Sequence, residues 1–127
     1  MNIAESKFSI TGRVKSFKHA LNGFIALLKN EHNFRIHLFV ATVAIVSGIY
    51  LHISLSEWCV IIFAITVVLI AEAINSSIEM LADVVSMDFN EKIKLAKDYG
   101  AFAVFICSIA ALICGLIIFI PKIVAIL

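Results

Sequence analysis

The chain of 127 residues is long enough for one domain, and 62% apolar residues with a mean hydropathy of +1.07 place it among membrane proteins. Its net charge of +1, with basic residues in small groups, excludes a nucleic-acid partner. The N-terminus lacks the apolar core and cleavage site of a signal peptide. The three cysteines lie in apolar segments without a Cys-x-x-Cys pair, so no redox or metal role is assigned to Cys59, Cys107 and Cys114.

The first predicted element is a basic amphipathic helix over residues 12–30. Apolar residues recur there at helical spacing, and basic residues fill much of the remaining surface. Such a helix is too polar to span a bilayer and suits an anionic membrane surface. A soluble surface helix is the alternative, which the long apolar segment that follows disfavours. The apolar residues are Val14, Phe17, Leu21, Phe24, Ile25 and Leu28, and the basic ones are Arg13, Lys15, Lys18 and Lys29.

Three transmembrane helices are predicted next, over residues 34–53, 58–81 and 99–120. Each has about the 20 residues that are needed to cross roughly 30 Å of hydrocarbon. Trp58 begins the second span, where an interfacial aromatic residue is expected. Pro121 is expected to end the third.

The placement of basic residues predicts the orientation. Nine of the ten Lys and Arg residues lie before the first span, at its start or in the connection 84–98, and none lies in 52–57. By the positive-inside rule, the N-terminus and the second connection are cytoplasmic and the C-terminus is outside.

A polar stripe interrupts the second predicted span. Glu72, Asn75, Glu79 and Asp83 fall within an arc of about 80° on one helix face. A carboxylate in such a segment costs several kcal/mol unless it faces a bundle interior, a cation or water. A buried polar pair that orients one helix against another is the simpler explanation, but four aligned polar groups exceed what orientation needs.

The stripe is expected near the cytoplasmic headgroup level, where the polar segments 30–37 and 92–99 also converge. Carboxylates in a partly dry place suit Mg²⁺, which binds oxygen ligands and keeps water and phosphate oxygens. Lys97 could bind a phosphate, and a spare carboxylate could accept a hydroxyl proton. The chain has no GxxxxGK[ST] loop and no protein-kinase motif set, so the residues alone predict an inner-leaflet site for a cation and phosphate.

Two nearby pairs have simpler explanations. Lys94 and Asp98 have the spacing of an ordinary i,i+4 helix pair. His32 and His37 lack the i,i+4 spacing of a helical metal pair, so metal ligation by them is not expected.

The segment Glu72-Ala-Ile-Asn75-Ser-Ser-Ile-Glu79-Met-Leu-Ala-Asp83, followed by Ala96-Lys97-Asp98-Tyr-Gly-Ala, resembles the signature of the prokaryotic diacylglycerol kinase family. Glu31-His-Asn33-Phe34-Arg35 resembles a second stretch of that family, and the resemblance covers residues 17–121. It implies an all-α lipid kinase of the bacterial cytoplasmic (inner) membrane. It also implies a homotrimer, with one amphipathic surface helix and three transmembrane helices in each subunit.

The resemblance also implies residue roles. Glu31 and Glu79 match Mg²⁺-binding carboxylates, and Glu72 matches the general base for the acceptor hydroxyl. Asn75 and Lys97 match residues that contact ATP phosphates. Further matches are Glu79, Asp83 and Asp98 at the nucleotide, Arg13 or Lys15 at a phosphate, and Arg35 and His37 with Glu72 at the lipid substrate.

One position bears on the acceptor. The branch that phosphorylates diacylglycerol has an acid where this chain has His37, whereas Arg35-Ile36-His37 resembles the undecaprenol kinase branch. Undecaprenol is therefore the expected acceptor, and diacylglycerol, which would give phosphatidic acid, is the alternative. From another class, a small channel or cation carrier could use the stripe as its path, but few polar groups continue it past Thr66. A bare assembly subunit would explain none of the converging charges.

Assembly is expected to complete the site, because three spans cannot enclose a pocket for both ATP and a lipid. The small residues Ala110, Ala111 and Gly115 on the third span would permit close packing in the trimer. The site is then expected between neighbouring subunits.

Overall fold

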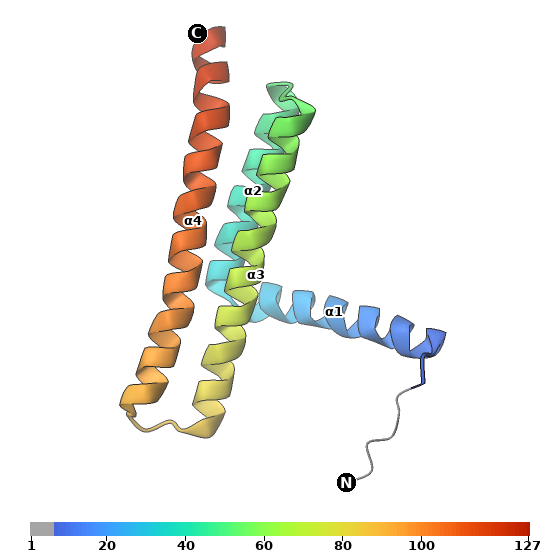
Figure 1. Ribbon diagram of the computed structural model, residues 1–127, viewed down its shortest axis with the longest axis vertical. Coiled ribbons are helices and arrows are strands. Elements are labelled where there is room, and N and C mark those ends of the chain that lie inside the picture. Colours follow the sequence, from blue (N-terminus) through green and yellow to red (C-terminus); the bar gives the residue numbers. More distant parts are fainter. Residues whose placement is uncertain (1–6) are drawn as a thin grey trace. The chain divides into compact units, whose positions relative to one another are not determined.

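The computed structural model describes residues 7–127, which form four α-helices (Figure 1). These are α1 (Ile10–Asn30), α2 (His32–Tyr50), α3 (Leu55–Val85) and α4 (Glu91–Ile126). The chain divides into two units, the first ending at Glu31 and the second comprising His32–Leu127. The expected all-helical class is confirmed, and α2, α3 and α4 are each long and apolar enough to cross a membrane.

The helix α1 makes up most of the first unit. Ser9 caps its start, because the Ser9 Oγ accepts the Gly12 N–H at 2.9 Å, and at its end the Glu31 N–H donates to the Leu27 carbonyl at 2.9 Å. No residue of α1 is buried within the unit, and the apolar side chains of Phe17 and Leu21 are exposed. The helix exists where the sequence pattern placed it, and its position on a membrane surface stays a prediction.

The second unit begins with α2, which ends earlier than the predicted limit of residue 53. His52 has a φ of 52°, the left-handed conformation that stops a helix. The His52 N–H donates to Ile49 at 3.3 Å and the Ile53 N–H donates to Gly48 at 3.2 Å. This pair of bonds is the Schellman arrangement, which satisfies the last carbonyls of α2 and turns the chain toward α3.

The beginning of α3 is fixed by a capping box. The Glu57 N–H donates to the Ser54 Oγ at 3.2 Å, and the Ser54 N–H donates to the Glu57 Oε2 at 2.8 Å. Beside it, Ile53, Ile61 and Ile118 form a buried apolar cluster, against which Trp58 packs. This end of the second unit is therefore a conventional apolar core.

Both α3 and α4 continue beyond the predicted spans, which were 58–81 and 99–120. At 1.5 Å per residue their 31 and 36 residues extend about 46 and 54 Å, more than the roughly 30 Å of hydrocarbon. The expectation that Pro121 ends α4 is wrong, because the helix continues to Ile126. A proline costs a helix its own N–H bond and crowds the carbonyl four residues earlier, but its φ is helical, so a last turn can still follow it. Lys122 also anchors this turn, since its Nζ lies 3.2 Å from the Glu57 Oε2.

The three helices of the second unit run side by side, with alternating direction (Figure 1). α3 packs along α4 more extensively than along α2, and α2 touches α4 at few places. The α2–α3 connection lies at one end, next to the C-terminal end of α4. The α3–α4 connection lies at the opposite end, and the polar stripe of α3 is on that side of the unit.

Candidate functional site

The polar stripe on α3 is closed at one end and open at the other. Among residues 7–127, the buried polar or charged side chains are Glu72, Asn75 and Ser76, which are 2%, 6% and 5% exposed. Glu79 and Asp83, one and two turns further along, are exposed. The stripe therefore leads from solvent-accessible carboxylates to a carboxylate enclosed by the helix bundle.

Glu72 lies next to a histidine of α2. The His37 Nε2 is 3.8 Å from the Glu72 Oε2, and the His37 side chain is 22% exposed. The sequence assigned both residues to the lipid acceptor, and the structure brings them together. A buried carboxylate beside an imidazole is an arrangement that can take and hold a proton.

Asn75 links the stripe to α4. Its Nδ2 donates to the Glu79 Oε1 at 3.5 Å, and its Oδ1 faces Gly100. A Cβ atom at Gly100 would overlap the Asn75 Oδ1, so only glycine lets the two helices approach with Asn75 in this position. No sequence pattern marks Gly100, because only the packing reveals its role.

Lys97 is held by the exposed end of the stripe. Its Nζ donates to the Asp83 Oδ1 at 2.7 Å, which joins α4 to α3 near their connection. Lys94 donates to the Asp98 Oδ2 at 2.6 Å in the i,i+4 pair that the spacing allowed. Lys97 is thus brought to the acidic stripe, whereas Asp98 is engaged on the surface of α4.

The remaining predicted residues are Arg35 at the beginning of the second unit, and Glu31, Arg13 and Lys15 in the first unit. Arg35 on α2 lies 2.7 Å from the His32 Nδ1 through its Nη2. Glu31 follows α1, the Arg13 guanidinium lies 6.0 Å from the centre of the Phe8 ring, and Lys15 is exposed. Their roles at metal, phosphate or lipid stay predictions.

The carboxylates of the stripe fit Mg²⁺ in one particular way. Within residues 7–127, no three His, Cys, Asp or Glu side chains are close enough together to enclose a metal ion. Mg²⁺ is commonly held by one or two carboxylates together with water and phosphate oxygens. The exposed Glu79 is a donor of that kind, so the residues present suit a metal that arrives with a nucleotide.

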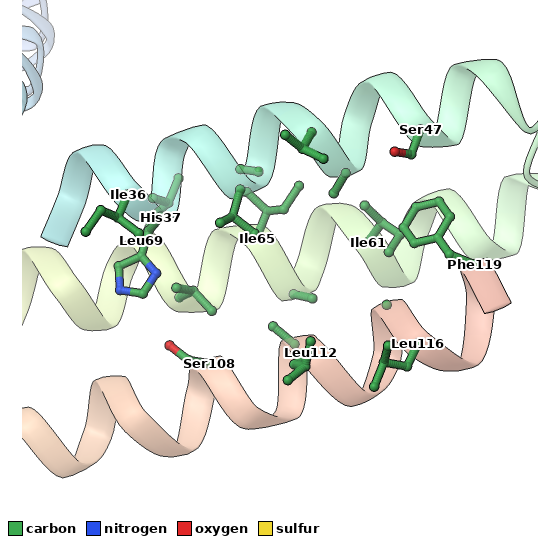
Figure 2. A pocket seen from close by; sticks show the side chains of 18 of the residues that line it. Ile36, His37, Ser47, Ile61, Ile65, Leu69, Ser108, Leu112, Leu116 and Phe119 are labelled. Carbon is green, nitrogen blue, oxygen red and sulfur yellow. The ribbon is translucent and has the colours of Figure 1, made fainter.

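An apolar groove of about 520 Å³ lies between α2, α3 and α4 (Figure 2). It includes His37, whose Nε2 is 3.8 Å from the Glu72 Oε2. His37 and Ser108 line one end of it, and from there the walls are almost entirely aliphatic. Leu69, Ile65 and Ile61 follow along α3, with Leu112 and Leu116 facing them from α4 and Phe119 near the far end. The groove suits a hydrocarbon chain whose polar end lies at His37.

Sequence reasoning missed two polar groups here. Ser76 lies about 40° from Glu72 around α3, about 20° beyond the edge of the stripe at Asp83. Ser108 lies on α4, and its Oγ is buried at the polar end of the groove. Both could have been noticed from helical spacing, but a search for charged residues passes over hydroxyls.

Comparison with known proteins agrees with this geometry. Residues 18–119 match the sequence profile described as "Prokaryotic diacylglycerol kinase". The chain is 33% identical to the undecaprenol kinase of Bacillus subtilis over 108 residues, 85% of this chain and 88% of that protein. It is 31% identical to the diacylglycerol kinase of Synechocystis sp., over 88% of this chain and 65% of that protein. It is also 31% identical to the diacylglycerol kinase of Haemophilus influenzae, over 87% of this chain and 94% of that protein.

These relatives are kinases that are named for a lipid acceptor, and the three apolar helices of this chain are those of a membrane protein. The expectation of a kinase is confirmed, which sets aside the channel and the bare assembly subunit. The chain belongs to the prokaryotic diacylglycerol kinase family and is a membrane lipid kinase.

Proposed function

We propose that this lipid kinase transfers the γ-phosphoryl group of ATP to the hydroxyl of undecaprenol. The observation that carries this proposal is the place of Glu72, which is buried where the polar stripe of α3 meets the apolar groove. A lipid whose chain lies in the groove would present its hydroxyl to His37 and Glu72. A nucleotide would approach from the exposed end of the stripe, at Glu79.

Glu72 acts as the general base in this reaction. The acceptor hydroxyl gives its proton to the Glu72 carboxylate as its oxygen attacks phosphorus, and burial keeps water from competing for the phosphoryl group. His37, 3.8 Å away, helps to orient the carboxylate and the hydroxyl.

Asn75 and Lys97 bind the phosphates of ATP. Asn75 has a buried amide oxygen beside Gly100 and an amide nitrogen turned toward Glu79, so a small rotation presents that nitrogen to a phosphate. Lys97 supplies a point charge: its Nζ gives up its hydrogen bond to Asp83 and binds a phosphate oxygen instead. Asp83 and Asp98 border the nucleotide, and Arg13 or Lys15 of the surface helix contributes a further basic contact.

Mg²⁺ would be held by Glu79 together with Glu31. When bound, it neutralises charge on the phosphate oxygens and fixes their positions, which is the main requirement of phosphoryl transfer. Glu79 is exposed and one turn from Asn75, so the same short segment of α3 serves metal and phosphate.

Undecaprenol is favoured over diacylglycerol by the residue at the polar end of the groove. The groove follows α2 from His37 to Ser47, about 15 Å, and its aliphatic walls suit the hydrocarbon chain of either lipid. A neutral imidazole can pair with a lone hydroxyl without burying a charge, which a carboxylate at the position of His37 could not do. Diacylglycerol is the second candidate, because relatives that are 31% identical carry that name.

We also propose a homotrimer with its active sites between neighbouring subunits, with α1 on the cytoplasmic face and the C-terminus outside. The exposed Ala110 points away from the groove and would permit close contact between subunits. Ala111 and Gly115 line the groove instead, so we assign these two residues to the lipid and the contact between subunits to Ala110.

Phosphate transfer by the purified protein tests the function. Radiolabelled ATP and Mg²⁺ are supplied with undecaprenol or diacylglycerol in matched micelles, and the wild type is compared with Glu72→Gln. We expect preferential labelling of undecaprenol, and loss of most transfer with little loss of nucleotide binding in the variant. Equal labelling of the two lipids would refute the acceptor, and lost nucleotide binding would remove Glu72 from the role of base.

A further inference from the structure

Ser76 is a buried hydroxyl that the roles above do not use. It is 5% exposed, and its Oγ has no hydrogen-bond partner within residues 7–127. The adjacent Asn75 Oδ1 is buried and without a partner in the same way. A polar group that is buried in this state costs free energy, and a native protein commonly keeps one where a ligand supplies the missing bond.

The hydroxyl of Ser76 also lacks a local hydrogen bond that several others on these helices make. Such hydroxyls donate to the carbonyl four residues earlier, which for Ser76 would be that of Glu72. Four side chains do so at 2.8–3.0 Å: Ser16 to Gly12, Thr42 to Leu38, Thr66 to Ile62, and Ser77 to Ala73. Ser76 stays available as a donor, although its immediate neighbour Ser77 is engaged.

The position of Ser76 along α3 indicates which ligand it serves. It lies about 6 Å along the helix axis from Glu72 and about 4.5 Å from Glu79. In the proposed function these are the base and the metal carboxylate, and the phosphoryl group in transfer must pass between them. The stripe opens at Glu79, so a nucleotide would approach Ser76 from that side.

We propose that Ser76 is a further catalytic residue, whose hydroxyl donates a hydrogen bond to a nonbridging oxygen of the transferred phosphoryl group. This inference rests on the proposed kinase chemistry. In the step, the bond between the acceptor oxygen and phosphorus forms and the bond from phosphorus to the β,γ-bridging oxygen breaks. The acceptor proton goes to Glu72, ADP leaves with the electron pair, and Ser76 gains and loses no atom.

Ser76→Ala tests the proposal, with Ser76→Thr as the variant that keeps the hydroxyl and Ser77→Ala as the matched control. Ser77 is exposed and its hydroxyl is satisfied by Ala73, so its loss should leave turnover unchanged. Because a hydrogen bond to a charged group is lost, we expect kcat of Ser76→Ala to fall about ten- to a hundredfold. Ser76→Thr should recover much of this loss.

Two binding measurements separate contact with the phosphoryl group from a structural role. In the presence of Mg²⁺, the Kd for a non-hydrolysable ATP analogue should rise in Ser76→Ala. The Kd for ADP should not change, because ADP lacks the γ-phosphoryl group. The melting temperature in detergent should equal or exceed that of the wild type, since the variant removes an unsatisfied buried hydroxyl.

Several outcomes would overturn the proposal. The first is a kcat of Ser76→Ala within twofold of the kcat of Ser77→Ala. The second is an equal loss of ADP binding and analogue binding in Ser76→Ala. The third is a lowered melting temperature of Ser76→Ala that explains its lost activity. Wild-type protein that binds nucleotide yet phosphorylates neither lipid would instead refute the proposed function, so the two failures are distinguishable.

Discussion

The contact between Gly48 and Trp58 allows a prediction with a calculated size. A Cβ atom at Gly48 would lie 2.8 and 3.0 Å from two carbons of the Trp58 ring and 3.0 Å from the Ile53 Cδ1. Gly48→Ala must therefore displace the Trp58 ring at the edge of the apolar cluster, and overpacking of this kind costs about 1–3 kcal/mol. Alanine recovers about 0.5–1 kcal/mol through its helix propensity. The net expectation is a loss of about 1–2 kcal/mol.

Gly115→Ala is the matched control for stability. Gly115 lies in a membrane-spanning helix of the same unit, and nothing lies within 4 Å of the position of its Cβ. This variant should gain about 0.5–1 kcal/mol from helix propensity alone. The two single-methyl variants should therefore differ by about 2 kcal/mol, roughly thirtyfold in the unfolding equilibrium.

Titration with SDS from a mild detergent measures this difference. Trp58 is the only tryptophan, so its emission reports directly on the core that the substitution perturbs. At saturating lipid, kcat of folded Gly48→Ala should stay near wild type, because the polar stripe lies at the opposite end of the unit from the cluster. The KM for the lipid is not part of this expectation, because Ile61 belongs to both the cluster and the groove. If Gly48→Ala were as stable as Gly115→Ala, the packing argument would be wrong.

Three further predictions concern the site. Glu79→Gln should lower Mg²⁺-dependent transfer more than about a hundredfold without dissociating the oligomer, and near-normal turnover would contradict its metal role. Mixing equal amounts of Glu31→Gln and Lys97→Ala subunits should restore about a quarter of wild-type activity if each site takes Glu31 from one subunit and Lys97 from its neighbour. Each of these two residues is then intact in about half of the sites, independently of the other. No recovery in proven mixed oligomers would favour sites within one subunit. His37→Glu should shift the kcat/KM ratio toward diacylglycerol, because a charged acid finds no partner on a polyprenol beyond its one hydroxyl. An unchanged ratio would leave His37 without a selective role.

The sequence predicts the helices of this chain well because long apolar runs have few alternatives in a membrane. It predicts their ends less well. The continuation of α4 past Pro121 depends on Lys122 meeting Glu57, residues 65 positions apart whose contact no local pattern encodes. The early end of α2 depends on His52, which adopts a left-handed conformation that glycine adopts more readily.

In the candidate site, too, the sequence predicts some features, and others depend on packing between helices. Aligned carboxylates identify the stripe from spacing alone, because an acid in an apolar helix needs an explanation. Gly100 has no such signal, since its value is the space it leaves for Asn75. Ser76 was missed for a different reason. A serine within a helix is ordinary until its burial and its missing hydrogen bond are known.

The uneven packing of the second unit has a physical cause. At the α2–α3 connection, isoleucine side chains, a capping box and the Glu57–Lys122 pair satisfy both apolar and polar groups. At the other end, Asn75 and Ser76 keep buried polar atoms without partners, and Glu72 is a buried carboxylate. A sequence selected for stability alone would replace these side chains with apolar ones, as it does on the rest of α3. The unpaired atoms of Asn75 and Ser76 make sense if substrates satisfy them, so the free energy that these two groups lack in the free protein becomes available when ATP and lipid bind.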